Sequence, residues 1–242
     1  MFAGPNGSGK STLKSVLPVE LLGVYLNPDE MEQAIRTSGF LDLSDYGLAA
    51  TAEEIIGHFQ NSSFLHAAGL STEAAKLRFN CGRLEFTGVK INSYFASVAA
   101  DFLRRQLLAR RISFTLETVM SSPDKVDLLE KAQALGYRTY LYYIATDDAA
   151  INISRVRARV KQGGHDVPEE KIVSRYHRSL ELLLKAVRHT HRAYVFDNSA
   201  PGQDRTWLAE ITNGRMLELK TDRMPAWFKR AVMDKIAGAT RT

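Results

Sequence analysis

The sequence contains a single cysteine, Cys81, and no apolar run of eighteen residues or more. One thiol cannot form a disulfide within the chain, and shorter apolar runs do not provide a membrane-spanning helix. The chain also does not open with a basic segment followed by an apolar stretch, which is the pattern of a secretory signal peptide. These absences lead us to expect a cytoplasmic protein without a membrane span.

Repeats, low-complexity tracts and linkers rich in proline, glycine or serine are also missing. Hydrophobic residues make up 45% of the 242 residues, which is enough for a packed core and argues against global disorder. We therefore expect residues 1–242 to form a single domain that could include one sizeable insertion.

The net charge of +5 is concentrated in one segment. Residues 151–192 contain ten Lys or Arg and four Asp or Glu, a local charge of +6, so the remainder of the chain sums to −1. This distribution favours a local polyanion site, which the phosphates of ATP or a nucleic acid would satisfy. Basic and aromatic residues are not interleaved, and this disfavours a nucleic-acid partner.

Short apolar segments alternate with helical patterns along most of the chain. The segments that predict buried strands are residues 1–4, 23–27, 112–117, 137–145 and 193–197. Two apolar stripes at helical spacing follow later strands, one formed by Val126, Leu129, Ala132 and Leu135, the other by Ile172, Tyr176, Leu180, Leu183 and Val187. The alternation predicts an α/β fold with a mainly parallel central sheet flanked by helices, and ligands at the carboxyl ends of its strands.

Two regions depart from this alternation. Residues 44–92 are interpreted as a helical insertion between the second and third strands. Residues 206–220 predict a strand pair around an Asn213–Gly214 turn, and an amphipathic helix is expected from Pro225 onward.

The N-terminal segment matches the P-loop pattern G-x-x-x-x-G-K-[ST]. Its glycines allow the backbone N–H groups to surround a phosphate, and the loop is expected to open a helix over residues 11–16. In such loops the lysine reaches the β- and γ-phosphates and the hydroxyl that follows binds Mg²⁺. The predicted ATP-binding residues, with Lys10 also catalytic and Ser11 the metal ligand, are Gly4, Pro5, Asn6, Gly7, Ser8, Gly9, Lys10, Ser11 and Thr12.

Asn27-Pro28-Asp29-Glu30 follows the second predicted strand and has two interpretations. Asn27 can cap a helix, Pro28 suits its first position and Glu30 can complete a capping box, which would leave Asp29 as an ordinary first-turn acid. Alternatively, Asp29 is the base that accepts a proton from the hydroxyl of an acceptor substrate.

Glu117 and Thr118 end the third predicted strand. A carboxylate at this position in P-loop proteins can hold Mg²⁺ or position a nucleophile. The alternative is that these are ordinary polar residues in a strand-end turn.

The basic segment resembles a kinase lid, with two helical arms joined by Gly163-Gly164. Arg155 and Arg159 are four residues apart and share a helix face, whereas Arg157 points elsewhere. The second arm starts at Pro168 and carries Arg175, so residues 151–180 form the expected lid region that closes over ATP. His165 in the connecting loop is either a phosphate contact or an ordinary loop histidine, and the basic helix faces could also simply be solvated.

In order along the chain, these motifs resemble the zeta-toxin family of P-loop kinases. The resemblance is carried by residues 4–12 (GPNGSGKST), 27–29 (NPD), 114–118 (FTLET), the lid with its GGHDVP core at 163–168, Arg175-Tyr176, and 195–199 (VFDNS). It covers most of the chain, and the ordered combination is far more specific than the P-loop alone.

The resemblance implies a P-loop kinase fold that uses ATP and Mg²⁺. It implies that Asp29 activates the acceptor hydroxyl, that Glu117 and Thr118 contact the substrate, and that Arg155 or Arg159, with Arg175, are the lid arginines. Characterised members phosphorylate a UDP-linked N-acetylamino sugar and are restrained by a small antitoxin, and a related branch phosphorylates a dinucleotide. The excursion at residues 44–92 is longer than the family pattern.

The leading hypothesis is thus an ATP-dependent small-molecule kinase acting on a nucleotide-linked metabolite, with a UDP-N-acetylamino sugar as the best single guess. A possible antitoxin is the expected protein partner. One alternative is a kinase of a dinucleotide or a nucleic-acid end. Another is a non-catalytic switch module that binds ATP and phosphorylates no acceptor.

Overall fold

The computed structural model describes residues 1–164, 166–200, 202 and 204–239. The chain divides into two compact units, one formed by Met1–Leu21 with Glu117–Thr242 and the other by Leu22–Leu116. We call the first the P-loop unit, because it contains residues 4–12, and the second the α5 unit, after its longest helix. In the described part of the chain, no helix combines the length and the apolar character needed to cross a membrane.

Seven strands of the described residues form one sheet in the order β10-β9-β8-β7-β1-β6-β2. The five strands from β8 to β2 are parallel, and β9 and β10 add an antiparallel pair at one edge. This arrangement confirms the predicted α/β class with a mainly parallel sheet. The bounds are Phe2–Ala3 for β1, Val24–Leu26 for β2, Phe114–Thr118 for β6, Tyr140–Ala145 for β7, Arg192–Asp197 for β8, Thr206–Thr212 for β9 and Met216–Leu219 for β10.

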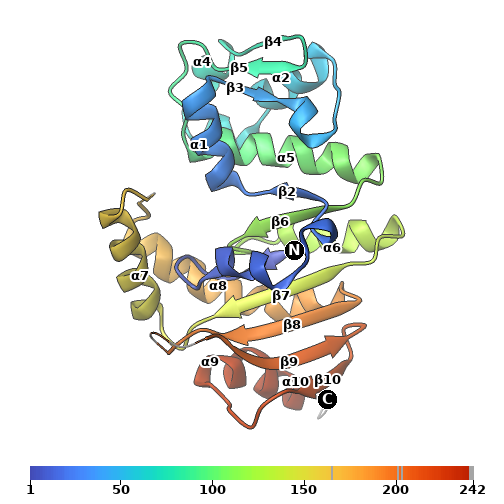
Figure 1. Cartoon of the computed structure of the whole chain (residues 1–242), viewed down its shortest axis with the longest axis vertical. Coiled ribbons are helices and arrows are strands. Elements are labelled where there is room, and N and C mark those ends of the chain that lie inside the picture. The colour runs from blue at the N-terminus through green and yellow to red at the C-terminus, as the bar shows by residue number, and fades with distance from the viewer. Residues whose placement is uncertain (165, 201, 203, 240–242) are drawn as a thin grey trace. The chain divides into compact units, whose positions relative to one another are not determined.

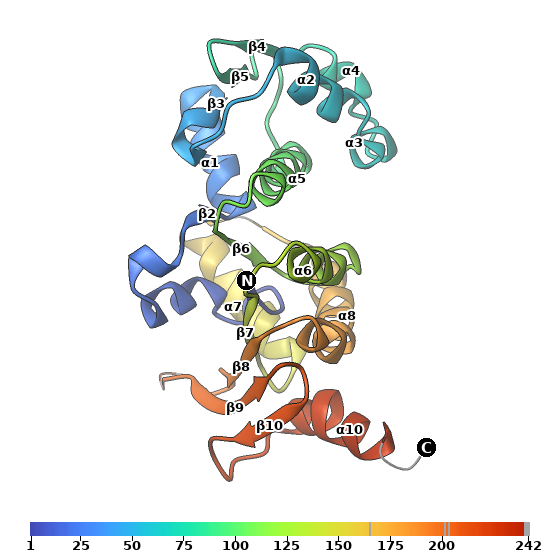
Figure 2. The same cartoon turned by 90° about the vertical axis from the view of Figure 1, so that its right-hand side faces the viewer.

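Helices of the P-loop unit cover one side of strands β7, β8 and β9, as Figure 2 shows for α6, α8 and α10. The core between them includes Leu141 and Tyr143 of β7, Val195 of β8, and Trp227 and Phe228 near the C-terminal end. The helices of the P-loop unit that follow β6 are α6 (Asp124–Ala134), α7 (Ala149–Lys161), α8 (Glu169–Arg188), α9 (Ala226–Phe228), the π-helical η4 (Lys229–Met233) and α10 (Asp234–Ala239).

The longest of these helices, α8, shows how the sequence pattern produces the packing. Ile172, Tyr176, Leu183 and Val187 of its predicted stripe are buried, and Leu180 is partly buried. Burial of one leucine side chain stabilises a fold by about 1.5–3 kcal/mol. Acidic residues lie in the first turn of α8 and basic residues in its last, in the sense that the helix dipole favours. The stripe therefore fixes which face of α8 meets the sheet.

The segment after the P-loop is helical, as expected, but it is a 3-10 helix. Residues Lys10–Val16 form the 3-10 helix η1, followed by a second short 3-10 helix, η2 (Val19–Leu21). Leu17, which precedes Pro18, adopts an extended conformation with φ −116° and ψ 142°. A residue before proline disfavours the helical conformation, which explains why η1 ends there.

The α5 unit combines helices with a small sheet. Figure 1 shows β3, β4 and β5 together with α1 and α5 of the same unit. The strand order of the small sheet is β3-β5-β4, and both pairings are antiparallel. The elements are α1 (Pro28–Ser38), β3 (Phe40–Asp42), η3 (Leu43–Tyr46), α2 (Ala52–Gln60), α3 (Ser63–Ala67), α4 (Ser71–Ala74), β4 (Arg78–Asn80), β5 (Arg83–Glu85) and α5 (Ser93–Ala109).

The helical interpretation of residues 44–92 is incomplete. The structure has helices α2, α3 and α4 there, but it adds the hairpin of β4 and β5. Cys81 and Gly82 form the turn of this hairpin with φ values of 47° and 80°. Strands of three residues are too short to show an alternating pattern, so hydrophobic periodicity could not reveal them.

The C-terminal predictions agree with the structure. Strands β9 and β10 pair around the Asn213–Gly214 turn, in which both residues have positive φ. A helical segment follows Pro225, and its Trp227 and Phe228 are fully buried against the main core.

Candidate active site

The P-loop lies between β1 and η1, at the carboxyl end of β1. The Gly4 N–H donates to the Thr118 carbonyl over 3.3 Å, which ties the start of the loop to β6. Gly9 has φ +98°, and a Cβ there would lie 2.5 Å from the Asn198 side-chain nitrogen. The Lys10 ammonium turns back over the loop and donates to the Pro5 carbonyl over 3.0 Å. The ammonium group of Lys10 therefore lies against the loop backbone at Pro5.

The structure brings two predicted site residues from distant segments together. The Ser11 hydroxyl donates to Oε1 of Glu117 over 3.4 Å, and Glu117 is buried at 8% exposure. Hydroxyl and carboxylate oxygens are hard ligands of the kind Mg²⁺ prefers, together with phosphate oxygens and water. The donor set of Ser11 and Glu117 thus fits a Mg²⁺ ion that accompanies a nucleotide.

Two asparagine side chains hold the P-loop from outside, and sequence analysis missed both roles. Asn152 of α7 donates to the Asn6 carbonyl, and Asn198, which follows β8, donates to the Ser8 carbonyl over 2.8 Å. A single amide has no sequence signature, although Asn198 directly follows a predicted strand end. Both bonds are made to loop carbonyls, and the Ser8 N–H donates to the Pro5 carbonyl over 3.2 Å.

The arginines of α7 divide between two faces, as predicted. Asn152, Arg155 and Arg159 follow one another at spacings of three and four residues, so they share the stripe that contacts the P-loop. Arg155 and Arg159 are half-buried. Arg157 is exposed on another face and pairs with Glu169 at the start of α8.

Several buried polar atoms of the loop and of α7 have no hydrogen-bond partner among the described residues. They are Oδ1 of Asn6, Oγ of Ser8 and Nη1 of Arg155. A buried polar group left unpaired costs about 1–3 kcal/mol, so clusters of such atoms mark places where a polar ligand would be stabilised. Two of the three, the serine hydroxyl and the guanidinium, can donate to an anion.

Arg175 lies on α8, half-buried, directly before the buried Tyr176. The small cluster of Val156, Val167 and Ile172 joins α7, the connecting segment and α8 into one packed pair of helices. Gly163 has φ +85° in the connection, where a residue other than glycine would be strained. His165, the possible phosphate contact, lies outside the described residues.

Thr118 and Asp29 are placed by local hydrogen bonds. The Thr118 hydroxyl accepts from the Met120 N–H over 3.1 Å, and it thereby holds the turn that follows β6. Asp29 is exposed in the first turn of α1, where its N–H donates to the side chain of Asn27 over 3.0 Å. The amide of Asn27 also donates to Glu30 over 3.2 Å. The predicted helix start is confirmed. Asp29 belongs to the α5 unit, and its catalytic role stays a prediction.

Arg205 is a further cation near the P-loop that sequence analysis did not single out. Its Nη1 donates to the Thr12 hydroxyl over 3.0 Å, and that hydroxyl donates to the Gly9 carbonyl over 2.7 Å. Arg205 lies between β8 and β9 in an irregular segment, so no periodic pattern could have marked it. It adds a positive charge beside η1.

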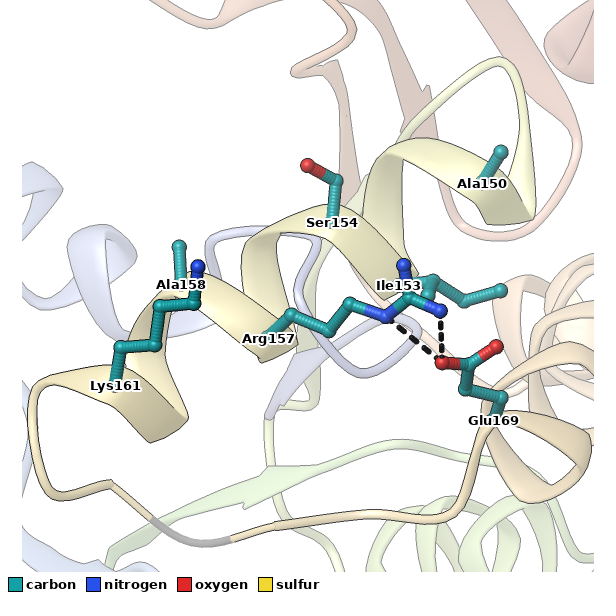
Figure 3. Close-up of a pocket in the computed structure, with 7 residues that line it drawn as sticks. All are labelled: Ala150, Ile153, Ser154, Arg157, Ala158, Lys161 and Glu169. Atoms are coloured by element: carbon teal, nitrogen blue, oxygen red, sulfur yellow. Dashed lines mark hydrogen bonds and ion pairs between the residues drawn. The ribbon is translucent and has the colours of Figure 1, made fainter.

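A cavity of about 500 Å³ lies on a different face of α7, and Figure 3 shows the residues that line it. The ion pair between Arg157 and Glu169 lies in its wall. None of the predicted site residues lines it. The complete lining is Ala150, Ile153, Ser154, Arg157, Ala158, Lys161 and Glu169.

The sheet order, the glycine-rich loop at the end of β1 and the helices around them define an α/β protein with a mainly parallel central sheet. The zeta toxin family model matches residues 89–201, so this region is similar to that family. The matched region includes Glu117, Thr118, Arg155, Arg159 and Arg175. The P-loop and Asp29 lie outside it.

A curated relative supports the comparison over a shorter stretch. An uncharacterized protein of Haemophilus influenzae is 32% identical over 69 residues, which is 28% of this chain and 49% of that protein. The match thus spans about half the length of the relative.

Solved structures of the AvrRxo1-ORF1:AvrRxo1-ORF2 complex share the fold. The complex with sulphate ions matches at a TM-score of 0.52 and 12% identity, over 91% of this chain and 60% of that chain. The complex with ATP matches at a TM-score of 0.50 and 12% identity, over 90% and 60% of the two chains. At these identities the likeness shows the fold, and this chain spans less than two thirds of those chains.

Proposed function

We propose that this protein is an ATP-dependent kinase that transfers the γ-phosphate to a hydroxyl group of a small molecule. The observation that carries the proposal is the contact of Ser11 in the P-loop with Glu117 at the end of β6, beside the face of α7 that bears Arg155. A zeta toxin match over residues 89–201 and a solved neighbour described as an ATP complex support the same function.

Each proposed role follows from the chemistry of the side chain. Lys10 and the lid arginines Arg155, Arg159 and Arg175 neutralise the charge of the phosphates during transfer. Ser11 and Glu117 would hold Mg²⁺, which would supply further positive charge at the phosphate oxygens.

The transfer itself needs a base. In the proposal, Asp29 accepts the proton of the acceptor hydroxyl while the oxygen of that hydroxyl forms a bond to the γ-phosphorus. The bond from that phosphorus to the β–γ bridging oxygen breaks, and ADP leaves with the electron pair.

The acceptor is proposed to be a nucleotide-linked metabolite, with a UDP-N-acetylamino sugar as the first candidate. This choice rests on the zeta-toxin resemblance. A dinucleotide is the other candidate acceptor. Because the solved neighbours are complexes of two proteins, ORF1 and ORF2, an inhibitory protein partner is also proposed. A cytoplasmic location stays an expectation from the sequence.

Two variants separate nucleotide binding from transfer. Lys10→Ala removes the P-loop cation and is expected to lower transfer about a thousandfold or more, with weaker ATP binding. Asp29→Ala is expected to bind ATP as the wild type does and to lose about a hundredfold to ten-thousandfold in transfer rate. ATP affinity is measured by calorimetry, and transfer by the appearance of labelled product.

The outcomes discriminate between the candidate functions. Normal transfer by Asp29→Ala would remove the assignment of the base. ATP binding and slow hydrolysis by the wild type, with no phosphorylated acceptor, would instead favour a non-catalytic switch. Phosphorylation that short oligonucleotides inhibit, with a steep dependence on salt, would favour a nucleic-acid end as acceptor.

A further inference from the structure

A chain of hydrogen bonds connects α8 to the P-loop through three buried side chains. The Tyr176 hydroxyl on α8 donates to the Thr146 carbonyl, directly after β7, over 2.7 Å. The Thr146 hydroxyl donates to Oδ1 of Asn152 on α7. The amide nitrogen of Asn152 then donates to the Asn6 carbonyl in the P-loop. Tyr176, Thr146 and Asn152 are all buried, so water does not compete for these bonds.

The donors and acceptors fix the direction of this chain. An asparagine amide accepts at its oxygen and donates at its nitrogen, so a donor on Oδ1 turns Nδ2 toward the next acceptor. The Thr146 hydroxyl is also 3.3 Å from the Asp148 carbonyl, which is its other possible acceptor. The bond from Tyr176 fixes the Thr146 backbone, and this position of the backbone favours the bond of the Thr146 hydroxyl to Asn152.

The backbone packing makes the loop sensitive to the position of Asn152. A Cβ on Gly7 would lie only 2.6 Å from the Asn152 carbonyl oxygen, so the first turn of α7 rests directly against the loop. Arg155 and Arg159 extend the same stripe of α7. Arg175 is the neighbour of Tyr176 on α8. A shift of Tyr176 would therefore reach the stripe of α7 that bears Arg155 and Arg159.

We propose that Tyr176 is a positioning residue that holds the P-loop in its nucleotide-binding shape through Thr146 and Asn152. This inference rests on the proposed ATP-binding function. Burial raises the pKa of the Tyr176 hydroxyl above its usual value of 10, so it remains a donor at physiological pH. The residue acts without touching the nucleotide.

Tyr143 provides a matched control. It is also a buried tyrosine between the sheet and α8, and its hydroxyl lies 3.0 Å from the Ser179 hydroxyl. Ser179 itself donates to the Val119 carbonyl over 2.8 Å, and neither residue belongs to the chain that reaches Asn152. Like Tyr176→Phe, Tyr143→Phe removes one buried tyrosine hydroxyl next to α8. Unlike Tyr176→Phe, it keeps the hydrogen bonds that run from Tyr176 to the P-loop.

The test measures Mg·ATP affinity by calorimetry for the full-length wild type and for the two variants. Tyr176→Phe is expected to weaken binding about threefold to tenfold, the loss typical of one hydrogen bond, while Tyr143→Phe binds like the wild type. In the nucleotide-free protein, hydrogen–deuterium exchange of residues 4–12 is expected to rise in Tyr176→Phe only. Wild-type affinity and wild-type exchange in Tyr176→Phe would overturn the inference.

A double-mutant cycle with Asn152→Ala tests the route. If Tyr176 acts through Asn152, the double variant binds ATP no more weakly than Asn152→Ala alone. Fully additive losses would overturn the route. If Tyr176→Phe does not fold, Thr146→Val removes the next donor of the chain and should give the same loss.

Failure of the two proposals can be told apart. A folded wild type that binds no ATP would contradict the proposed function, while the exchange of residues 4–12 would still test the link to Tyr176.

Discussion

At the scale of single residues, Arg155 and Arg157 of α7 form a natural pair of test and control. They are two positions apart on one helix, but only Arg155 shares the stripe of Asn152 and has a buried nitrogen, Nη1, without a hydrogen-bond partner among the described residues. Arg157 is exposed and pairs with Glu169. Arg155 is therefore the proposed phosphate contact, and Arg157 forms a surface ion pair.

Arg155→Ala is therefore expected to lower the transfer rate about a hundredfold to a thousandfold, because it removes a cation from the developing phosphate charge. Arg157→Ala should change the rate less than about twofold, since exposed ion pairs contribute little. Steady-state kinetics of both variants, with thermal melts to check folding, make the comparison. Equal losses of transfer rate in the two variants would contradict the assignment of the phosphate contact to Arg155.

Sequence analysis reached some of these residues and not others, for a physical reason. Lys10, Ser11 and the separation of Arg155 from Arg157 follow from a motif and from helical spacing, which are local. Asn152 and Asn198 contact the P-loop only because α7, which follows β7, and the segment after β8 both meet that loop. That meeting depends on tertiary structure, and one amide leaves no periodic trace in the sequence.

At the scale of elements, the contact between α2 and α5 contains a histidine whose charge opposes folding. His58 of α2 lies 3.4 Å from the Asp101 carboxylate of α5, and its ring packs edge-on against Phe102 at 5.4 Å. Burial lowers the pKa of His58 below 6.5, although Asp101 acts in the opposite direction and Arg105 and Arg104 act with burial. The neutral ring is therefore the form that fits the packed state better.

This contact predicts a pH dependence of stability. Below pH 6.5 the unfolded chain binds a proton at His58 more readily than the folded chain, so the contribution of His58 is present above pH 6.5 and is lost as pH falls through that value. Thermal melts at pH 8 and pH 5.5 should show a smaller acid destabilisation for His58→Gln than for the wild type. An equal or larger loss in the variant would contradict this assignment.

The elements also show where periodicity stops being informative. The long stripe of α8 and the buried run of β7 predict their elements well, because each spans enough residues to display its period. The three-residue strands β3, β4 and β5 do not. The helix after the P-loop was expected from the motif. It forms as a 3-10 helix that ends before Leu17 and Pro18.

At the scale of the whole molecule, the sheet is the feature that gathers the site. Parallel strands place their carboxyl ends at one edge, so β1, β6, β7 and β8 supply the P-loop, Glu117, Asn152 and Asn198 from widely separated parts of the sequence. The fold class could be predicted because strands and helices alternate. The division into two compact units could not, since β6 passes from one unit to the other without a linker.

The central claim is phosphoryl transfer, and one measurement tests it most directly. The purified protein is incubated with ATP labelled at the γ-phosphate and a metabolite pool that contains UDP-sugars and dinucleotides, and the labelled product is identified by mass spectrometry. We expect a phosphorylated nucleotide-linked metabolite that forms with the wild type and is lost with Lys10→Ala. Bound ATP without any labelled acceptor across the pool would contradict it.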